Sequence, residues 1–242
     1  MRDWYSHCRV CPHFCGVDRL AGETGVCGLG AGLKIAAAQL HFGEEDVLVG
    51  GGGSGTLFFS SCNLACVYCQ NYDISHYRFG QEVSVDHAVN LVLSLQARGA
   101  ENINLVSPTH QAPAVAELIE CARERGLRLP VVYNTGGYDN PELLRDLEGL
   151  IDIYMPDMKY SDGETSGRLS GAADYPYWNR AALLEMQRQV GELEVDCRGV
   201  ARRGVMIRHL VLPDSATGSR ETMEFIATEL STNTYLNIME QY

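Results

Sequence analysis

Three cysteines stand close together, directly after a run of residues that predicts a buried strand. Cys62, Cys66 and Cys69 have the spacing C-x3-C-x2-C, and the strand is predicted over 55–59. Cysteine thiolates are the usual ligands of iron–sulfur clusters, and a four-iron cluster needs one ligand for each iron. Three ligands leave one iron open to a substrate. The alternatives are a structural zinc site, which favours four ligands in paired short spacings, and inert buried cysteines.

Four further cysteines form a second group near the start of the chain. They are Cys8, Cys11, Cys15 and Cys27, and prolines, glycines and charged residues separate them. A segment so rich in loops has little core of its own, so a bound metal would supply folding free energy. Four thiolates suit a closed zinc site and a fully ligated second [4Fe-4S] cluster equally well. The sequence does not choose between the two.

The charge balance limits the partners of this protein. The 242 residues carry 19 Lys and Arg against 31 Asp and Glu, a net charge of −12. Nucleic-acid binders normally present a basic face, which argues against nucleic acid as a partner. No apolar run approaches the ~18 residues of a membrane span, and the N-terminus lacks the apolar core of a signal peptide. We therefore expect a cytoplasmic protein without membrane contact, in which cysteines serve as metal ligands more often than as disulfides.

Strand and helix patterns alternate after the cysteine loop. Ser84 is placed to cap a helix that ends before Gly99, and Pro113 opens the next helix. The chain therefore has the pattern of an α/β protein with a parallel sheet. We expect a Cys-rich segment over 1–48 and the sheet domain over 49–242. The six strands are predicted over 55–59, 102–106, 130–134, 151–155, 205–212 and 235–239.

Polar residues follow the predicted strands at their carboxyl ends, where parallel α/β folds hold their sites. Five polar strand ends facing one cysteine loop indicate a functional site more strongly than any single residue does. The candidates are Ser107, Thr109 and His110 after the second strand, Asn134 at the third, Asp157 and Lys159 after the fourth, Arg208 and His209 in the fifth, and 240–242 after the last.

Five blocks of this sequence resemble the pyruvate formate-lyase-activating-enzyme-like iron–sulfur proteins of the radical S-adenosylmethionine (radical SAM) superfamily. The blocks are CNLACVYCQN (62–71), NINLVSPTH (102–110), VVYN (131–134), DIYMPDMKY (152–160) and RHLVLP (208–213). The resemblance implies a partial (βα)6 TIM-like barrel of the radical SAM type, preceded by the cysteine-rich segment. It also implies a [4Fe-4S] cluster on Cys62, Cys66 and Cys69, with S-adenosylmethionine bound to the open iron. One-electron reduction would then cleave the cofactor to a 5′-deoxyadenosyl radical, which abstracts hydrogen from a substrate.

The resemblance also assigns expected roles to single residues. Tyr68 would lie against the adenine, and Val211 and its neighbours would flank it. Ser107 to Thr109 stand where the superfamily often has Gly-Gly-Glu, so backbone carbonyls and Thr109 would accept from the amino group of the cofactor. Asp157 and Lys159 would bind the ribose and the carboxylate, with Arg208 as the alternative partner of the carboxylate. His110, Asn134 and His209 are cofactor-binding candidates by their place at strand ends.

The family name suggests one substrate, a glycyl residue of a partner glycyl radical enzyme. A low-potential electron donor such as flavodoxin or ferredoxin would supply the electron. The alternatives are radical modification of RNA, a peptide or a metabolite, and a non-catalytic iron–sulfur or zinc module. The chain departs from the family at Tyr242, its last residue, where such barrels carry a closing helix.

Overall fold

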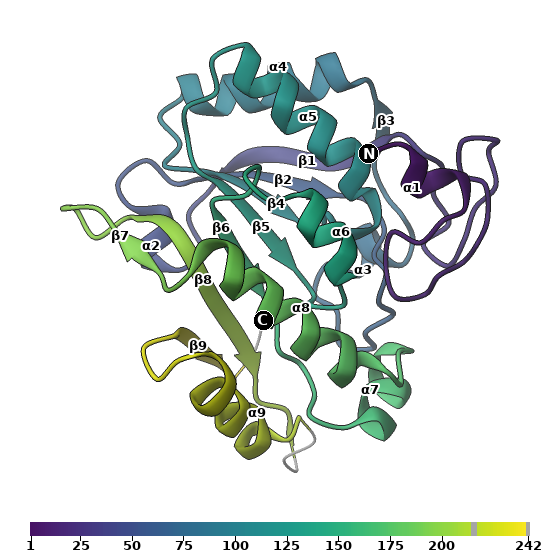
Figure 1. Ribbon diagram of the computed structural model, residues 1–242. Helices are drawn as coiled ribbons and strands as arrows, with labels where there is room; N and C mark the ends of the chain where they lie inside the picture. The colour runs from purple at the N-terminus through teal and green to yellow at the C-terminus, as the bar shows by residue number, and fades with distance from the viewer. Residues whose placement is uncertain (214–216, 241–242) are drawn as a thin grey trace.

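A nine-stranded sheet forms the centre of the part of the chain that the computed structural model describes, residues 1–213 and 217–240. Its order is β3-β1-β2-β4-β5-β6-β8-β7, and β9 also pairs with β8 (Figure 1). The strands are β1 Leu33–His41, β2 Ser54–Phe59, β3 Gln81–Val83, β4 Ile103–Val106, β5 Val131–Thr135, β6 Ile153–Pro156, β7 Glu194–Val195, β8 Ala201–Leu210 and β9 Tyr235–Met239. The helices are α1 Asp3–Ser6, α2 Asp46–Val49, α3 Tyr72–Ser75, α4 Val85–Ala97, the 3₁₀ turn η1 Thr109–Gln111, α5 Ala112–Glu124, α6 Pro141–Asp146, α7 Gly163–Ser170, α8 Tyr175–Val190, α9 Ser219–Phe225 and the π-helical turn η3 Ile226–Leu230.

The predicted parallel α/β architecture is confirmed. Strands β2, β4, β5, β6, β8 and β9 run parallel in that spatial order and correspond to the six predicted strands. Among the described residues, the edges β3 and β9 do not pair with each other, so the barrel is partial and open. The carboxyl ends of the parallel strands therefore lie along one curved rim.

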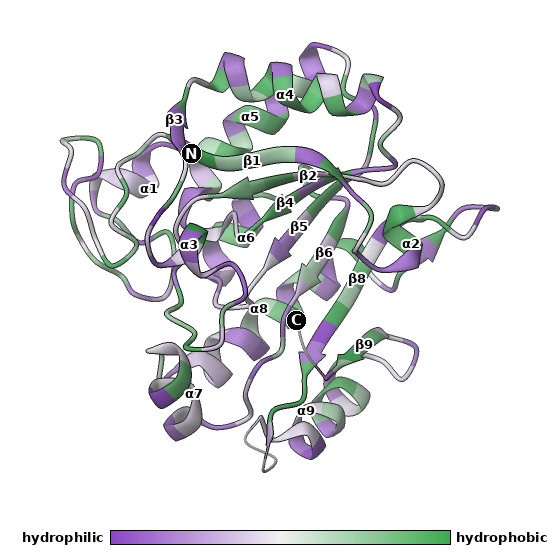
Figure 2. Cartoon of the chain, turned by 180° about the vertical axis from the view of Figure 1, so that it is seen from behind, coloured by the Kyte–Doolittle hydropathy of each residue, from purple (hydrophilic) through white to green (hydrophobic). Residues whose placement is uncertain are grey.

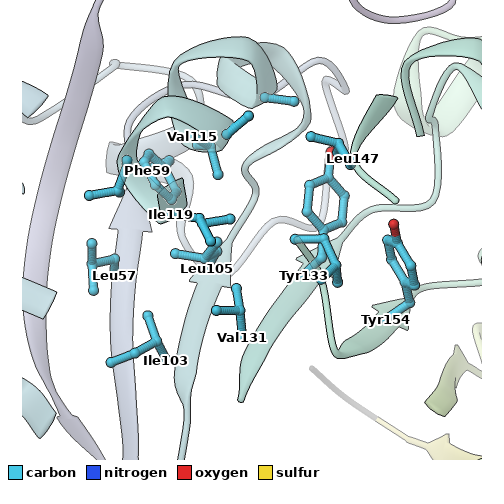
Figure 3. Packing of buried hydrophobic residues seen from close by; sticks show 14 of the residues in the cluster. Leu57, Phe59, Ile103, Leu105, Val115, Ile119, Val131, Tyr133, Leu147 and Tyr154 are labelled. Atoms are coloured by element: carbon cyan, nitrogen blue, oxygen red, sulfur yellow. The ribbon is translucent and has the colours of Figure 1, made fainter. Parts of the chain in front are cut away.

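Helices α4, α5, α6 and α8 cover the outer face of the sheet (Figure 1). Ser84 caps α4 as predicted, since its hydroxyl accepts from the His87 N–H at 3.1 Å. Val115 and Ile119 of α5 pack with Leu105 and neighbouring strand residues in one buried cluster (Figure 3). Fully burying one such side chain contributes about 1.5–3 kcal/mol. This packing fixes the strands and, through them, the loops at the rim.

The inner face of the sheet is seen from behind in Figure 2, where the strands rather than the outer helices face the viewer. Leu48 of the short helix α2 packs there against Val132, Ile153 and Met206. Asn102 holds α2 in place by donating from Nδ2 to the Leu48 carbonyl at 2.8 Å. An apolar contact therefore fills part of the inner face, and the polar residues lie nearer the strand ends.

One part of the chain differs from the sequence-based expectation. The sequence predicts an irregular stretch after the fourth strand, yet α7 forms there, and Asp162 caps it by accepting from the Thr165 N–H at 2.8 Å. Strand β1 lies within the expected 1–48 segment and pairs antiparallel with β2 as part of the sheet, while the expected boundary at residue 48 stays a prediction. No helix among the described residues is long and apolar enough to cross a membrane.

Candidate active site

The loop that carries the three cysteines connects β2 to α3 and is held by the end of α7. The Ala65 N–H donates to the Ser170 carbonyl over 3.0 Å. The Val67 N–H donates to the Leu169 carbonyl over 2.9 Å. The last carbonyls of a helix have no partner within the helix, so α7 offers the loop acceptors at a fixed place.

Each of the three thiols accepts a hydrogen bond. The pairs are Leu64 N–H to Cys62 Sγ at 3.4 Å, Ser170 Oγ–H to Cys66 Sγ at 3.0 Å, and Ser75 Oγ–H to Cys69 Sγ at 3.2 Å. Burial, reinforced by the charge of Cys66, raises the pKa of the Cys62 thiol to about 12. Burial also raises the pKa of Cys66. The thiols of Cys62 and Cys66 thus stay protonated until a positive centre, such as a metal, favours the thiolate.

An ion pair lies beside the loop. Lys159 Nζ donates to Asp157 Oδ2 at 2.6 Å just beyond β6, and both side chains are largely buried. The charge of Lys159 lowers the pKa of the Cys66 thiol, against the larger effect of burial. A Cβ added at Gly136 would lie 3.0 Å from Leu64 Cδ1 and 3.6 Å from Lys159 Cε. The ends of β5 and β6 therefore pack directly against the loop, and the expected contact of Asp157 and Lys159 with a cofactor stays a prediction.

Tyr68 reaches the same place from within the loop. Its hydroxyl forms a short hydrogen bond with the Tyr160 hydroxyl. Tyr160 is fully buried and packs with Cys66 and Leu64. The expected stacking of Tyr68 on an adenine stays a prediction.

Thr109 and His110 lie in the wall behind the loop. The Thr109 hydroxyl donates to Asp139 Oδ1 at 2.7 Å, and burial raises the pKa of that carboxyl. His110 Nε2 bonds the Ser60 carbonyl at 2.8 Å, and burial lowers the pKa of this histidine to about 4. Both side chains thus hold protein groups, and their expected contact with a cofactor stays a prediction.

Ser107 and Asn134 lie next to each other at the ends of β4 and β5. The Ser107 N–H donates to the Asn134 carbonyl at 2.8 Å. Ser107 has a φ of +56°, the left-handed region that side-chain-bearing residues seldom occupy. Backbone strain of this kind is concentrated at functional sites. The expected acceptance from the amino group of the cofactor by carbonyls after β4 stays a prediction.

Arg208 is already paired with carboxylates. It donates to Glu45 Oε1 and Oε2, each at 2.7 Å, and forms a further ion pair with Glu44. Asn237 Nδ2 also donates to Glu45, at 2.8 Å. Burial alone would raise the pKa of Glu45, yet the hydrogen bond and charge of Arg208 lower it. To bind a cofactor carboxylate as expected, Arg208 would have to give up part of its bonding to Glu44 and Glu45.

His209 and Val211 lie on either side of the end of β8. His209 Nδ1 bonds the Met158 carbonyl at 2.6 Å and Nε2 bonds the Ser219 hydroxyl at 2.8 Å, and burial lowers its pKa. Val211 lines a cavity of about 500 Å³ with Ile238, Met239 and Glu240. Val211 thus faces open volume, whereas His209 joins β8 to β6 and α9. The last two candidate residues, 241–242, lie outside the described residues.

The N-terminal cysteines stand on a segment without helix or strand between α1 and β1. The Val26 N–H donates to Cys15 Sγ at 3.4 Å, and Arg19 lies 3.9 Å from Cys8 Sγ. A Cβ at Gly25 would lie only 2.5 Å from Cys15 Sγ, so the close approach requires glycine. This segment contacts the cysteine loop directly.

Two hydrogen bonds make that contact. Ser61 donates to the Cys27 carbonyl at 2.6 Å, and His13 Nε2 bonds the Asn63 carbonyl at 2.7 Å. A cavity of about 160 Å³ lies between the two cysteine groups, lined by His13, Val26 and Cys62 among others. The N-terminal segment is therefore part of the wall of the site.

The family model of the radical SAM superfamily matches residues 56–190, from β2 and the cysteine loop to the end of α8. The chain belongs to the radical SAM superfamily. Membership supports radical chemistry by cleavage of S-adenosylmethionine and implies a [4Fe-4S] cluster.

Individual relatives agree with this assignment. The uncharacterized protein MJ0674 of Methanocaldococcus jannaschii is 30% identical over 98% of this chain and 66% of its own length. Pyruvate formate-lyase-activating enzymes of Staphylococcus aureus are 26% identical over 65% of this chain and 61% of theirs. The chain thus spans about two thirds or less of the length of these relatives. The crystal structure of HydG, a maturase of the [FeFe]-hydrogenase, shares the fold with a TM-score of 0.50 and 13% identity, over 70% of this chain and 37% of that one.

The thiols of this radical SAM chain fit an iron–sulfur cluster. Among the described residues, no three His, Cys, Asp or Glu side chains stand in the arrangement that one metal ion needs. A four-iron cluster binds each thiolate at a different iron. In the loop, Cys62, Cys66 and Cys69 each accept a hydrogen bond from a different donor, which suits three separate iron ligands.

Several site residues carry no signal in the sequence. Glu44 and Glu45 reach Arg208 from the turn between β1 and α2, more than 160 positions away in the chain. Ser170 reaches Cys66 across 104 positions. Serines and glutamates are common on protein surfaces, so only the folded chain distinguishes these from solvent-exposed ones.

Proposed function

We propose that this protein is a cytoplasmic radical SAM enzyme that acts as the activase of a glycyl radical enzyme. The observation that carries the proposal is the loop of three thiols, each with its own hydrogen-bond donor, at the carboxyl ends of a partial barrel. The likeness to pyruvate formate-lyase-activating enzymes supports the choice of a glycyl residue as the site of hydrogen abstraction.

Cys62, Cys66 and Cys69 would hold a [4Fe-4S] cluster, which with bound S-adenosylmethionine supplies a 5′-deoxyadenosyl radical for abstraction of hydrogen. Lys159 suits the cofactor carboxylate because its ammonium is a compact charge, and Asp157 holds that ammonium in place. Val211 and Tyr68 would enclose the adenine. The buried wall behind the loop excludes water, which prevents loss of a reactive species to side reactions.

The four N-terminal thiols would hold a zinc ion or a second cluster, and for zinc they would have to move together, since the described residues hold no three such ligands in the arrangement that one ion needs. Gly25 lies close to Cys15 Sγ, and the Val26 N–H donates to that sulfur. The hydrogen bond supports a metal site, because thiolate ligands accept such bonds. A low-potential donor such as flavodoxin or ferredoxin would deliver the electron for each reduction.

The test is anaerobic reconstitution with iron and sulfide, followed by dithionite reduction with S-adenosylmethionine present. We expect 5′-deoxyadenosine, measured by chromatography, and no product without reductant. Its absence would overturn the radical SAM assignment of activity. A candidate glycyl radical enzyme with deuterated glycine should then transfer deuterium to 5′-deoxyadenosine, and product formed without transfer would overturn the glycyl substrate alone.

A further inference from the structure

Three hydroxyl groups lie in a row that ends on a thiol of the cysteine loop. The Tyr68 hydroxyl bonds the Tyr160 hydroxyl, which bonds Ser170 Oγ at 2.6 Å. The Ser170 hydroxyl then donates to Cys66 Sγ at 3.0 Å. The row joins the loop, the segment after β6 and the end of α7, so three distant parts of the chain build it.

The single proton of each hydroxyl fixes the direction of the hydrogen bonds in this row. A hydroxyl carries a single proton. Because Ser170 uses its proton on Cys66, Tyr160 must donate to Ser170, and Tyr68 must then donate to Tyr160. Aligned donors of this kind polarise one another, so each bond strengthens the next.

We infer that Tyr68, Tyr160 and Ser170 form a directed hydroxyl chain that sets the reduction potential of the cluster bound through Cys66. The inference rests on the proposed function. Hydrogen bonds to cluster sulfurs are one of the factors that set the potential of such a cluster. Reduction adds negative charge to the cluster and its thiolates, so a donor on Cys66 stabilises the reduced state more and raises the potential.

The inner two groups of this hydroxyl chain, Tyr160 and Ser170, lie in a dry environment, whereas Tyr68 is half-buried. Tyr160 is 0% exposed and Ser170 is 1% exposed. Away from water a hydrogen bond is electrostatically stronger, and solvent does not replace a donor that is removed.

The other two thiols lack an equivalent arrangement. Cys62 accepts from a backbone N–H, which no side-chain substitution removes. The Ser75 hydroxyl donates to Cys69 Sγ at 3.2 Å, but it also bonds His76 Nδ1 at 2.8 Å and lies 3.5 Å from the Tyr72 carbonyl. Because several groups compete for this hydroxyl, its bond to Cys69 is less strongly directed than the bond of Ser170 to Cys66, where the hydroxyl chain should have the larger effect on the potential.

The test is a redox titration of the reconstituted full-length chain without S-adenosylmethionine, monitored by electron paramagnetic resonance. In Ser170→Ala we expect the equilibrium constant for reduction to fall up to about tenfold, which is about 59 mV for a one-electron couple. Tyr160→Phe should lower it less, since Ser170 keeps its own proton, and Tyr68→Phe least. Ser166→Ala is the matched control, because this buried serine of the same helix donates to the Gly163 carbonyl at 3.2 Å instead of a thiol.

The outcomes separate the two proposals. A wild-type chain that assembles no reducible cluster overturns the proposed function and this inference with it. A wild-type cluster whose potential is unchanged in both Ser170→Ala and Tyr160→Phe overturns this inference alone. If Ser170→Ala fails to assemble its cluster, the potential of Tyr160→Phe decides by itself.

Discussion

The two cysteine groups lie against each other yet are supported in different ways. In the N-terminal group the sulfurs meet a backbone N–H at Cys15 and the buried guanidinium of Arg19 at Cys8. In the loop group, Cys66 and Cys69 accept from serine hydroxyls. The N-terminal segment also has no helix or strand of its own between α1 and β1, whereas α7 and the end of β2 hold the loop.

The two groups therefore depend on a metal to different degrees. The N-terminal segment has no helix or strand to hold its shape, whereas the loop is anchored to α7. Two loop thiols also accept from serine hydroxyls, which a substitution can remove, so these donors can adjust the electronic properties of a ligand. We therefore expect loss of the N-terminal ligands to affect local folding first, and loss of the loop ligands to affect chemistry first.

The largest effect should come from Cys66→Ala. Without this thiolate the loop offers two ligands, too few to hold a cluster with a single open iron. We expect iron bound at the loop to be lost and 5′-deoxyadenosine formation to fall below detection, by iron analysis and chromatography. Cys121→Ala, a lone half-buried cysteine, is the control that should behave as wild type. Product formation by Cys66→Ala at the wild-type rate would contradict the ligand assignment.

The second largest effect should come from the double variant in which both Cys8 and Cys11 are replaced by serine. We expect one zinc ion or one cluster less per chain, and faster proteolysis within the segment before β1, because the metal supplies part of its folding free energy. Elemental analysis and limited proteolysis with mass spectrometry measure the two. Cys121→Ser with Cys197→Ser is the matched control. Unchanged metal content and proteolysis would remove the contrast between the two groups.

The sequence predicted the sheet well because its cause is local. Apolar runs of strand length, separated by capped helical patterns, are enough to indicate parallel strands and their order along the chain. Helix α7 was not predicted, since its residues Gly163, Ser166 and Gly167 are poor helix formers. Its capping by Asp162 and its bonds to the cysteine loop stabilise it.

The site was predictable only in part. The cysteine spacing is a local signal, and it points to the loop directly. The hydroxyl donor Ser170 and the carboxylate Glu45 act across long separations in sequence, and ordinary residue types of this kind have no distinguishing pattern. Thr109 and His110 stand at a strand end as expected, yet that position alone does not tell whether a side chain faces a cofactor or the protein wall.

A smaller effect is expected at His110, which lies between the two groups. Its side chain bonds the Ser60 carbonyl before the loop, and its own carbonyl accepts from Arg19 at 2.7 Å. Burial lowers its pKa to about 4, against an ordinary value near 6.5. Between these values the unfolded chain binds a proton that the folded chain does not, so stability falls as the pH falls. The difference between the two pKa values corresponds to a loss of about 3 kcal/mol in the free energy of unfolding.

His110→Gln tests this, since an amide N–H can replace Nε2 as donor to Ser60. Urea unfolding from pH 7 to pH 4 should show that the variant loses about 3 kcal/mol less stability than wild type over this range. The exposed His87→Gln should keep the wild-type profile. Parallel profiles for wild type and His110→Gln would show that the histidine does not link the groups to pH.

The smallest effect is expected at Ser61, which joins the groups directly. Its hydroxyl donates to the Cys27 carbonyl at 2.6 Å while its backbone holds a φ of +71°. Ser61→Ala removes the bond and keeps the strain, so we expect a loss of about 1 kcal/mol in the free energy of unfolding. Ser61→Gly removes the bond but relieves a strain of about 1–2 kcal/mol, so its stability should return to or exceed that of wild type. Urea unfolding measures both. Equal losses in the two variants would mean that the left-handed turn costs nothing, whereas no loss in Ser61→Ala would mean that the hydroxyl does not hold the two cysteine groups together.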